Sequence, residues 1–174
     1  GKRGTHQFDE YFAEFEKAGI NWARVWMCSW WCGLEWRRDW PGYQGLGRYN
    51  LLNAWRMDHV LEDAERKGIR ISLCLTNHGQ FTLVIDTEWE NNPYNARLGG
   101  PLQAASEFFT RADAKIAHQN KLRYVVARYA HSPAILAWDL FSELEFTEEY
   151  EASLNFRGQD QPAHNIESWH AEMA

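Results

Sequence analysis

The segment SPAILAWDLFSELEF, residues 132–146, is apolar along most of its length and then ends on two carboxylates, Glu143 and Glu145. Pro133 marks its start, because the residue before a proline is pushed out of the helical region. The run AILAWDLF that follows carries few charges, as is typical of a strand buried on both faces. We therefore predict a buried strand that delivers a carboxylate to the edge of a sheet.

Two earlier segments have the same character. INWARVWMCSW (residues 20–30) and IRISLCLTNHG (residues 69–79) are rich in β-branched and aromatic residues and carry few charges. The second segment ends on a polar cluster of Thr76, Asn77 and His78. Both segments are predicted to be strands.

A helical pattern precedes each predicted strand. Apolar residues recur every three or four positions from Phe8 to Ala18, from Met57 to Gly68 and from Leu122 to Tyr129, and NIESWHAEMA (residues 165–174) begins a further helix. The expected core stripes of the middle two helices are Met57, Val60, Leu61 and Ala64, and Leu122, Val125, Val126 and Tyr129. Alternation of helices and strands predicts a parallel sheet with right-handed crossovers.

Two architectures fit this alternation, an open doubly wound sheet and an eight-stranded TIM-type β/α barrel. Long polar and aromatic segments follow the strands, including an irregular stretch over residues 80–106, and this favours the barrel, whose active site is built from such loops. No G-x-G-x-x-G follows a strand, which weakens the dinucleotide-binding version of the open sheet. A complete barrel needs about 250 residues. We therefore expect residues 1–174 to form a single partial barrel domain, truncated at both ends, with about strands 2 to 4 and their helices.

Composition narrows the range of partners. The chain is 45% hydrophobic and 15% aromatic, which predicts a globular protein with a real core. A formal net charge of −6 argues against a nucleic-acid partner, since phosphate binding needs clustered Lys and Arg. No apolar stretch approaches the ~18 residues of a membrane span, so no membrane partner is expected. The sequence leaves the cellular compartment open.

Cysteine and histidine patterns bear on disulfides and metals. Cys28, Cys32 and Cys74 are expected to be buried structural thiols, with a Cys28–Cys32 bridge or metal site as the alternative. A metal-dependent barrel hydrolase is a further reading, but the histidines show no H-x-H or H-E-x-x-H spacing, so neither a metal nor another cofactor is expected. These histidines are His78, His118, His131, His164 and His170.

The two carboxylates of residues 132–146 are expected to have different roles. Glu143 lies where the strand emerges into a loop, where it could act as a general acid, cap the strand end or pair with a basic residue. Glu145 is two residues further and would lie roughly 6 to 7 Å away in an extended strand. Neighbours on one strand would sit side by side rather than on opposite faces of a scissile bond, so Glu145 is predicted to be a loop or rim residue.

These segments together resemble a known superfamily. ILAWDLFSELEF resembles the fourth-strand motif of the clan A glycoside hydrolases, which include cellulases, β-mannanases and β-galactosidases. NWARVWMCSWW is similar to their second strand with its arginine, and GIRISLCLTNHGQF to their third strand. The loop NPYNARLGGP and the helix after it most resemble the family-five mannanase and cellulase-related branch. The resemblance covers nearly the whole chain and implies a retaining β-glycoside hydrolase acting on O-glycosidic bonds in poly- or oligosaccharides.

The resemblance also implies roles for individual residues. Glu143 matches the general acid/base, which protonates the departing oxygen and then deprotonates the attacking water. Arg24 matches the arginine that holds the nucleophilic carboxylate, although a salt bridge between strands fits the same position. Asn77 and His78 lie where the family places groups that contact the sugar.

Tryptophans are candidates for stacking on pyranose rings. Trp26, Trp30, Trp31 and Trp36 are expected near the rim of the site, although aromatic side chains serve equally in core packing. Trp30 and Trp31 are the preferred substrate-binding candidates. Trp138 lies deeper in its strand and is predicted to be a packing residue.

The sequence departs from the family pattern in two ways. Ser142 replaces the usual Asn before the acid/base, so substrate binding by this residue is expected to be rearranged or water-mediated, and a catalytically silent carbohydrate-binding relative is the alternative function. The family's nucleophilic glutamate comes from the seventh strand, and nothing in residues 1–174 matches it. The expected partners are therefore a carbohydrate substrate and the remainder of the barrel, without which the chain alone is expected to be inactive.

Overall fold

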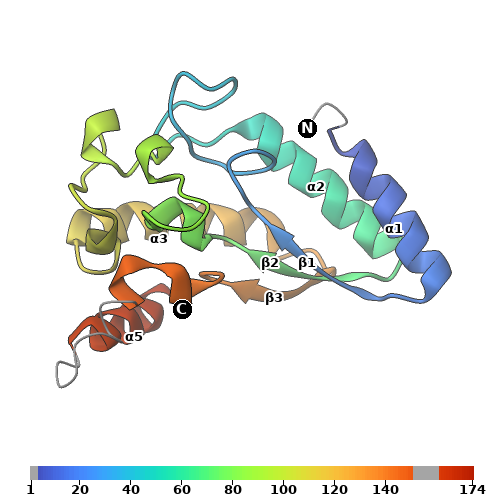
Figure 1. Ribbon diagram of the computed structural model, residues 1–174. Helices are drawn as coiled ribbons and strands as arrows, with labels where there is room; N and C mark the ends of the chain where they lie inside the picture. The colour runs from blue at the N-terminus through green and yellow to red at the C-terminus, as the bar shows by residue number, and fades with distance from the viewer. Residues whose placement is uncertain (1–3, 151–160) are drawn as a thin grey trace.

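One parallel sheet organises the chain in the computed structural model, which describes residues 4–150 and 161–174. Its strands are β1 (Trp22–Trp26), β2 (Arg70–Cys74) and β3 (Ile135–Asp139), and they lie in the order β1-β2-β3 (Figure 1). Both strand pairs are parallel. The predicted parallel α/β arrangement is confirmed, although each strand is shorter than its apolar segment.

Four α-helices accompany the strands in the described part of the chain. They are α1 (His6–Ala18), α2 (Leu51–Arg66), α3 (Ala112–Tyr129) and α5 (Gln161–Met173). All four correspond to predicted helices. Gly19 ends α1 in the left-handed conformation, with φ of 70°, which glycine adopts without steric cost.

The core lies between the sheet and the helices. The predicted stripe of α2 is buried throughout, and Leu122, Val125 and Tyr129 of α3 are buried as predicted. The prediction is wrong for Val126, which is 44% exposed. Val126 is rotated by about 100° from Val125 around the helix, so the apolar face of α3 is narrower than expected.

Burial on both faces was also predicted for β3, and this is wrong. Leu136 of β3 is 59% exposed. In the described sheet β3 is an edge strand with β2 as its one neighbour, whereas Ile71 and Leu73 of the central strand are fully buried. Central position therefore decides burial here more than apolar composition does.

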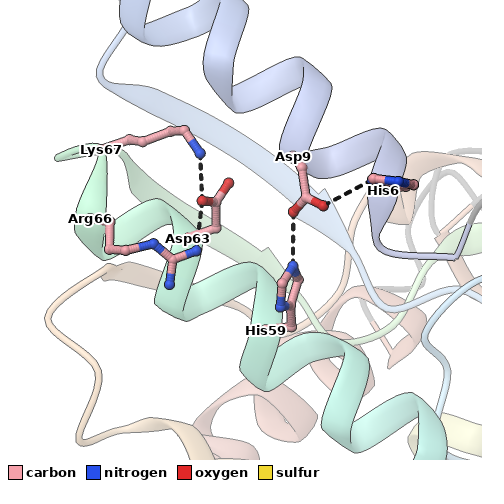
Figure 2. Close-up of polar contacts among 6 residues, drawn as sticks. All are labelled: His6, Asp9, His59, Asp63, Arg66 and Lys67. Atoms are coloured by element: carbon pink, nitrogen blue, oxygen red, sulfur yellow. Dashed lines mark hydrogen bonds and ion pairs between the residues drawn. The ribbon is translucent and has the colours of Figure 1, made fainter.

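Polar contacts join α1 to α2, which lie side by side (Figure 1). Figure 2 shows Asp9 of α1 between two histidines, with Nε2 of His59 at 2.8 Å and Nδ1 of His6 at 3.3 Å. Desolvation by burial acts to raise the pKa of Asp9, but the hydrogen bonds from His59 and His6 outweigh it and lower this pKa. Asp63 of α2 contacts Arg66 of the same helix and Lys67, which directly follows the helix (Figure 2). Of these contacts, the one between Asp9 and His59 joins the two helices.

The connection after β2 is the longest of the described loops. It contains short 3₁₀ turns, as expected for the irregular stretch predicted over residues 80–106, and Phe81 stacks on Phe108 with ring centroids 3.9 Å apart. Further rings of this aromatic cluster are Trp89, Tyr94, Phe109, Phe141 and Trp169. Aromatic packing therefore fixes the path of the loop that borders the C-terminal edge of the sheet.

Cys28, Cys32 and Cys74 are all free and buried, which confirms the prediction of buried thiols over a Cys28–Cys32 bridge. Burial raises the pKa of Cys28 to about 12. The helices described in the structure include none with the length and apolar character that crossing a membrane requires.

Candidate active site

A cavity of about 600 Å³ opens at the C-terminal edge of the sheet. Its walls come from the chain that ends or follows each of the three strands. The lining residues are Trp26, Trp30, Asn77, His78, Gly79, Asp86, Glu88 and Glu143. Functional sites of parallel α/β proteins lie at this edge, where loops from several strands converge.

Backbone pairing carries the chain from β3 to Glu143. The Ser142 amide donates to the Thr76 carbonyl at 2.9 Å, and the His78 amide donates to the Ser142 carbonyl at 3.1 Å. Glu143 then adopts the left-handed conformation, with φ of 58° and ψ of 46°. Such a conformation is uncommon outside glycine. The chain thus turns sharply at Glu143, and its carboxylate lines the cavity.

The carboxylate of Glu143 faces an imidazole. Its Oε2 atom lies 3.1 Å from Nδ1 of His78, within ion-pair distance but without hydrogen-bond alignment. The His78 side chain is 5% exposed, whereas that of Glu143 is 35% exposed. The imidazole packs edge-on against Trp26 and Phe146, with centroids 6.3 and 5.3 Å away. A fixed imidazole therefore lies beside a carboxylate that reaches solvent.

The side chain of Arg24, on β1, links the three strands. Its guanidinium donates to Asp139 Oδ2 and to Cys74 Sγ, both at 3.2 Å, and to Ser142 Oγ. The Cys74 thiol donates to Asp139 at 2.9 Å. Burial and this hydrogen bond raise the pKa of Cys74 to about 12, so the thiol stays neutral. The salt bridge between strands that the sequence left open for Arg24 is present.

The structure separates the predicted site residues into two groups. Those that line the cavity are Trp30, Asn77, His78 and Glu143. Arg24, Trp31 and Ser142 do not line it. Trp31 packs on Phe8 of α1 with ring centroids 4.3 Å apart, and Ser142 is 1% exposed and accepts a hydrogen bond from Arg24.

The structure also shows where the other tryptophans considered in the sequence and Glu145 lie. The expectation that Trp36 lies near the rim is wrong, because Trp36 is 2% exposed in the core. Trp26 does line the cavity, and Trp138 packs against the core as predicted. Glu145 is exposed on the 3₁₀ turn η5 (Leu144–Phe146), a loop position as predicted.

Two acidic residues of the cavity were not among the predicted site residues. Asp86 and Glu88 lie in the loop after β2. Glu88 Oε1 accepts a hydrogen bond from the Ser29 hydroxyl, while its Oε2 is buried without a hydrogen-bond partner in the described structure. Burial raises the pKa of Glu88. The signal in the sequence was DTEWE, an acidic segment in the long loop after the second strand.

Metal-binding side chains are dispersed in the part of the chain that the structure describes. Residues 4–150 and 161–174 contain no group of three or more His, Cys, Asp or Glu placed to hold an ion. His118 is fully buried on α3 against the rings of Phe108 and Trp169, and His131 is exposed after that helix.

Curated proteins similar to this chain include mannan endo-1,4-beta-mannosidases. Mannan endo-1,4-beta-mannosidase 3 of Oryza sativa subsp. japonica is 31% identical over 145 residues, which are 76% of this chain and 28% of that protein. The probable mannan endo-1,4-beta-mannosidase A-1 of Aspergillus terreus is 30% identical over 144 residues, 78% of this chain and 34% of that protein. The chain thus spans about a third of these relatives' length. No protein-family model matches it.

Solved structures resemble the fold. The endo-1,4-beta-mannanase of Rhizomucor miehei aligns with a TM-score of 0.60 and 14% identity, over 97% of this chain and 48% of that one. The endo-beta-1,4-mannanase of Thermotoga petrophila aligns with a TM-score of 0.56 and 19% identity, over 95% and 37% of the two chains. At these identities the likeness concerns the fold alone, and it favours the β/α barrel over the open doubly wound sheet.

Proposed function

We propose that the protein containing this chain is a glycoside hydrolase. The chain is a relative of the mannan endo-1,4-beta-mannosidases, and its strand motifs resemble those of the clan A glycoside hydrolases. The chain would supply about strands 2 to 4, with their helices, to a TIM-type barrel. The substrate class is a β-linked poly- or oligosaccharide, with β-1,4-mannan as the first candidate. The mechanism we propose is the retaining one.

The general acid/base in this mechanism is Glu143. One observation supports the assignment above all: its partly exposed carboxylate lies in a cavity at the C-terminal edge of the sheet, beside Trp26 and Trp30. A carboxyl group there can protonate the departing glycosidic oxygen and later take the proton of the attacking water. The left-handed turn at Glu143 comes directly after the paired extension of β3, so the backbone of this residue is placed by the sheet.

Neighbouring residues of the cavity have supporting roles in this proposal. His78 positions the carboxyl group through its contact with Oε2, which leaves Oε1 for the substrate. Asn77 and His78 line the cavity but are themselves buried, so the side chain best placed to meet a sugar ring is Trp30, which is 59% exposed. Precise placement of this kind contributes to rate by holding reactive groups in the geometry of attack.

Arg24 has a different role, toward the nucleophile. A retaining enzyme needs a second carboxylate about 5 to 5.5 Å from the first. No residue of this chain matches that carboxylate, so in the proposal a later strand supplies it. Arg24 is anchored on Asp139 and Ser142, and its side chain is 40% exposed, which leaves donor capacity to hold the incoming carboxylate.

The alternative is a carbohydrate-binding relative that does not catalyse hydrolysis. Ser142 favours it, since this short side chain is buried and bonded to Arg24, and so cannot replace an amide that reaches toward a sugar. Incubation of the complete protein with β-1,4-mannan and β-1,4-glucan separates the two functions. The proposal expects soluble products whose anomeric configuration, followed by NMR, is initially β. Tight binding without product over long incubation favours the alternative, and absence of both binding and product contradicts both.

A further inference from the structure

A second cavity, of about 450 Å³, adjoins the one at Glu143. Trp30 lines both cavities, which therefore meet at this residue. The other residues that line this second cavity include Ser29, Trp31, Trp40, Tyr43, Asn53 and Arg56. The Ser29 hydroxyl donates to Glu88, which lines the first cavity, so the two walls are joined by a hydrogen bond as well.

Aromatic side chains give the second cavity its apolar surface. Trp40 is 37% exposed, and its ring lies 6.2 Å from that of the buried Trp36, so its position is fixed from behind. Trp31 is held in a similar way by Phe8. Rigid and partly exposed indole faces suit the C–H faces of pyranose rings, since they provide a large contact area with little loss of side-chain freedom.

A chain of hydrogen bonds forms the polar side of the cavity. The Tyr43 hydroxyl donates to the Ser29 carbonyl at 2.5 Å, and Asn53 Nδ2 donates to the Tyr43 hydroxyl at 3.0 Å. Arg56 donates one N–H to Asn53 Oδ1 at 2.8 Å. Within the described residues no carboxylate lies at ion-pair distance from Arg56. Its other N–H groups are therefore available to hydroxyl acceptors on a ligand.

We propose that this second cavity is a saccharide subsite, which binds a sugar unit of the same chain whose scissile unit lies at Glu143. The saccharide crosses Trp30, stacks on Trp40 and is hydrogen-bonded by Arg56. This inference rests on the proposed function for the identity of the ligand. It also sharpens that function, because two adjoining subsites suit an oligo- or polysaccharide chain rather than a single small glycoside.

Binding by a non-hydrolysing variant tests the subsite directly. In the complete protein carrying Glu143→Gln, β-1,4-mannooligosaccharides of increasing length are titrated by calorimetry against W40A, R56Q and the matched control W55A. Trp55 is also an exposed indole, but it lines neither cavity. The longer oligosaccharides are expected to bind W40A about tenfold more weakly than the parent, whereas the shortest bind unchanged. W55A is expected to match the parent at every length.

Further variants keep the test decisive. W40F retains an aromatic face and is expected to recover most of the lost affinity, and R56Q is expected to weaken the longer chains alone. Should W40A fail to fold by circular dichroism, W40F and R56Q decide. Parent-like binding of all lengths by W40A and R56Q overturns the subsite, as does affinity in the parent that does not rise with length. Trp40-dependent binding by a wild-type protein that releases no product supports the subsite and contradicts the hydrolase.

Discussion

Nδ1 of His78 lies 3.1 Å from Oε2 of Glu143, and backbone hydrogen bonds from Ser142 to Thr76 and from His78 to Ser142 tie the extensions of β2 and β3 together just before Glu143. The His78 amide bonds to the Ser142 carbonyl, so the two side chains approach because β2 and β3 remain paired beyond their ends. The relative placement of imidazole and carboxylate is therefore a property of the sheet and not of a loose loop.

Removal of this imidazole should impair catalysis in the complete protein. His78→Ala leaves the Glu143 carboxyl free to rotate, and misplacement of a catalytic group by an ångström can cost about 10²-fold in rate. We expect kcat/KM on mannan to fall by about that factor. The matched control is His131→Ala, at an exposed position outside the cavity. Equal rates for the two variants would show that His78 does not position the acid/base.

Ionisation of Glu88 should make the free energy of unfolding depend on pH above the ordinary pKa of a glutamate. Burial raises its pKa above the ordinary glutamate value of 4.5, so the folded protein keeps a proton that the unfolded chain has lost. The free energy of unfolding should therefore fall as pH rises from about 4.5 through the raised pKa. Glu88→Gln cannot ionise, and urea unfolding at a series of pH values should show a shallower fall. Glu90→Gln, exposed in the same loop, should retain the wild-type slope.

His118 should have the opposite effect. Burial, with a smaller repulsion from Lys121, places its pKa well below the ordinary value of 6.5. Below pH 6.5 this imidazole binds a proton in the unfolded chain but stays neutral in the folded protein. The free energy of unfolding should therefore decrease as pH falls below about 6.5. His118→Phe preserves the aromatic contacts and should flatten this decrease. An unchanged acid-side slope, measured beside the exposed control His131→Gln, would refute the assignment.

The position of Glu143 at the C-terminal edge of the sheet could be predicted from the sequence for a physical reason. In a parallel sheet the passage from apolar strand to carboxylate marks the C-terminal edge, and β3 does deliver the chain to Glu143 there. The helices could be predicted equally well, because their apolar residues recur with a period of about 3.6 residues. The ends of the short strands could not be predicted as well. Residues such as Met27 are apolar and buried although they follow the end of β1 and lie in the loop.

Loop residues could not be placed from the sequence. Asp86 and Glu88 enter the cavity because the segment after β2 is folded back by contacts such as Phe81 on Phe108, which are distant along the chain. Trp30 and Trp31 are adjacent, yet Trp30 lines the cavity while Trp31 packs on α1. Outside a helix or strand no period fixes the direction of a side chain, so only the folded structure distinguishes such neighbours.

A matched pair of variants tests whether Glu143 is the general acid/base. Glu143→Gln and Glu145→Gln are each made in the complete protein, and hydrolysis of unmodified β-1,4-mannan is followed by the release of reducing sugar. Removal of a general acid/base typically costs about 10² to 10⁴-fold. We expect a loss of this size for Glu143→Gln and near wild-type hydrolysis for Glu145→Gln, which alters an exposed loop residue. Near-normal hydrolysis by Glu143→Gln would contradict this role of Glu143.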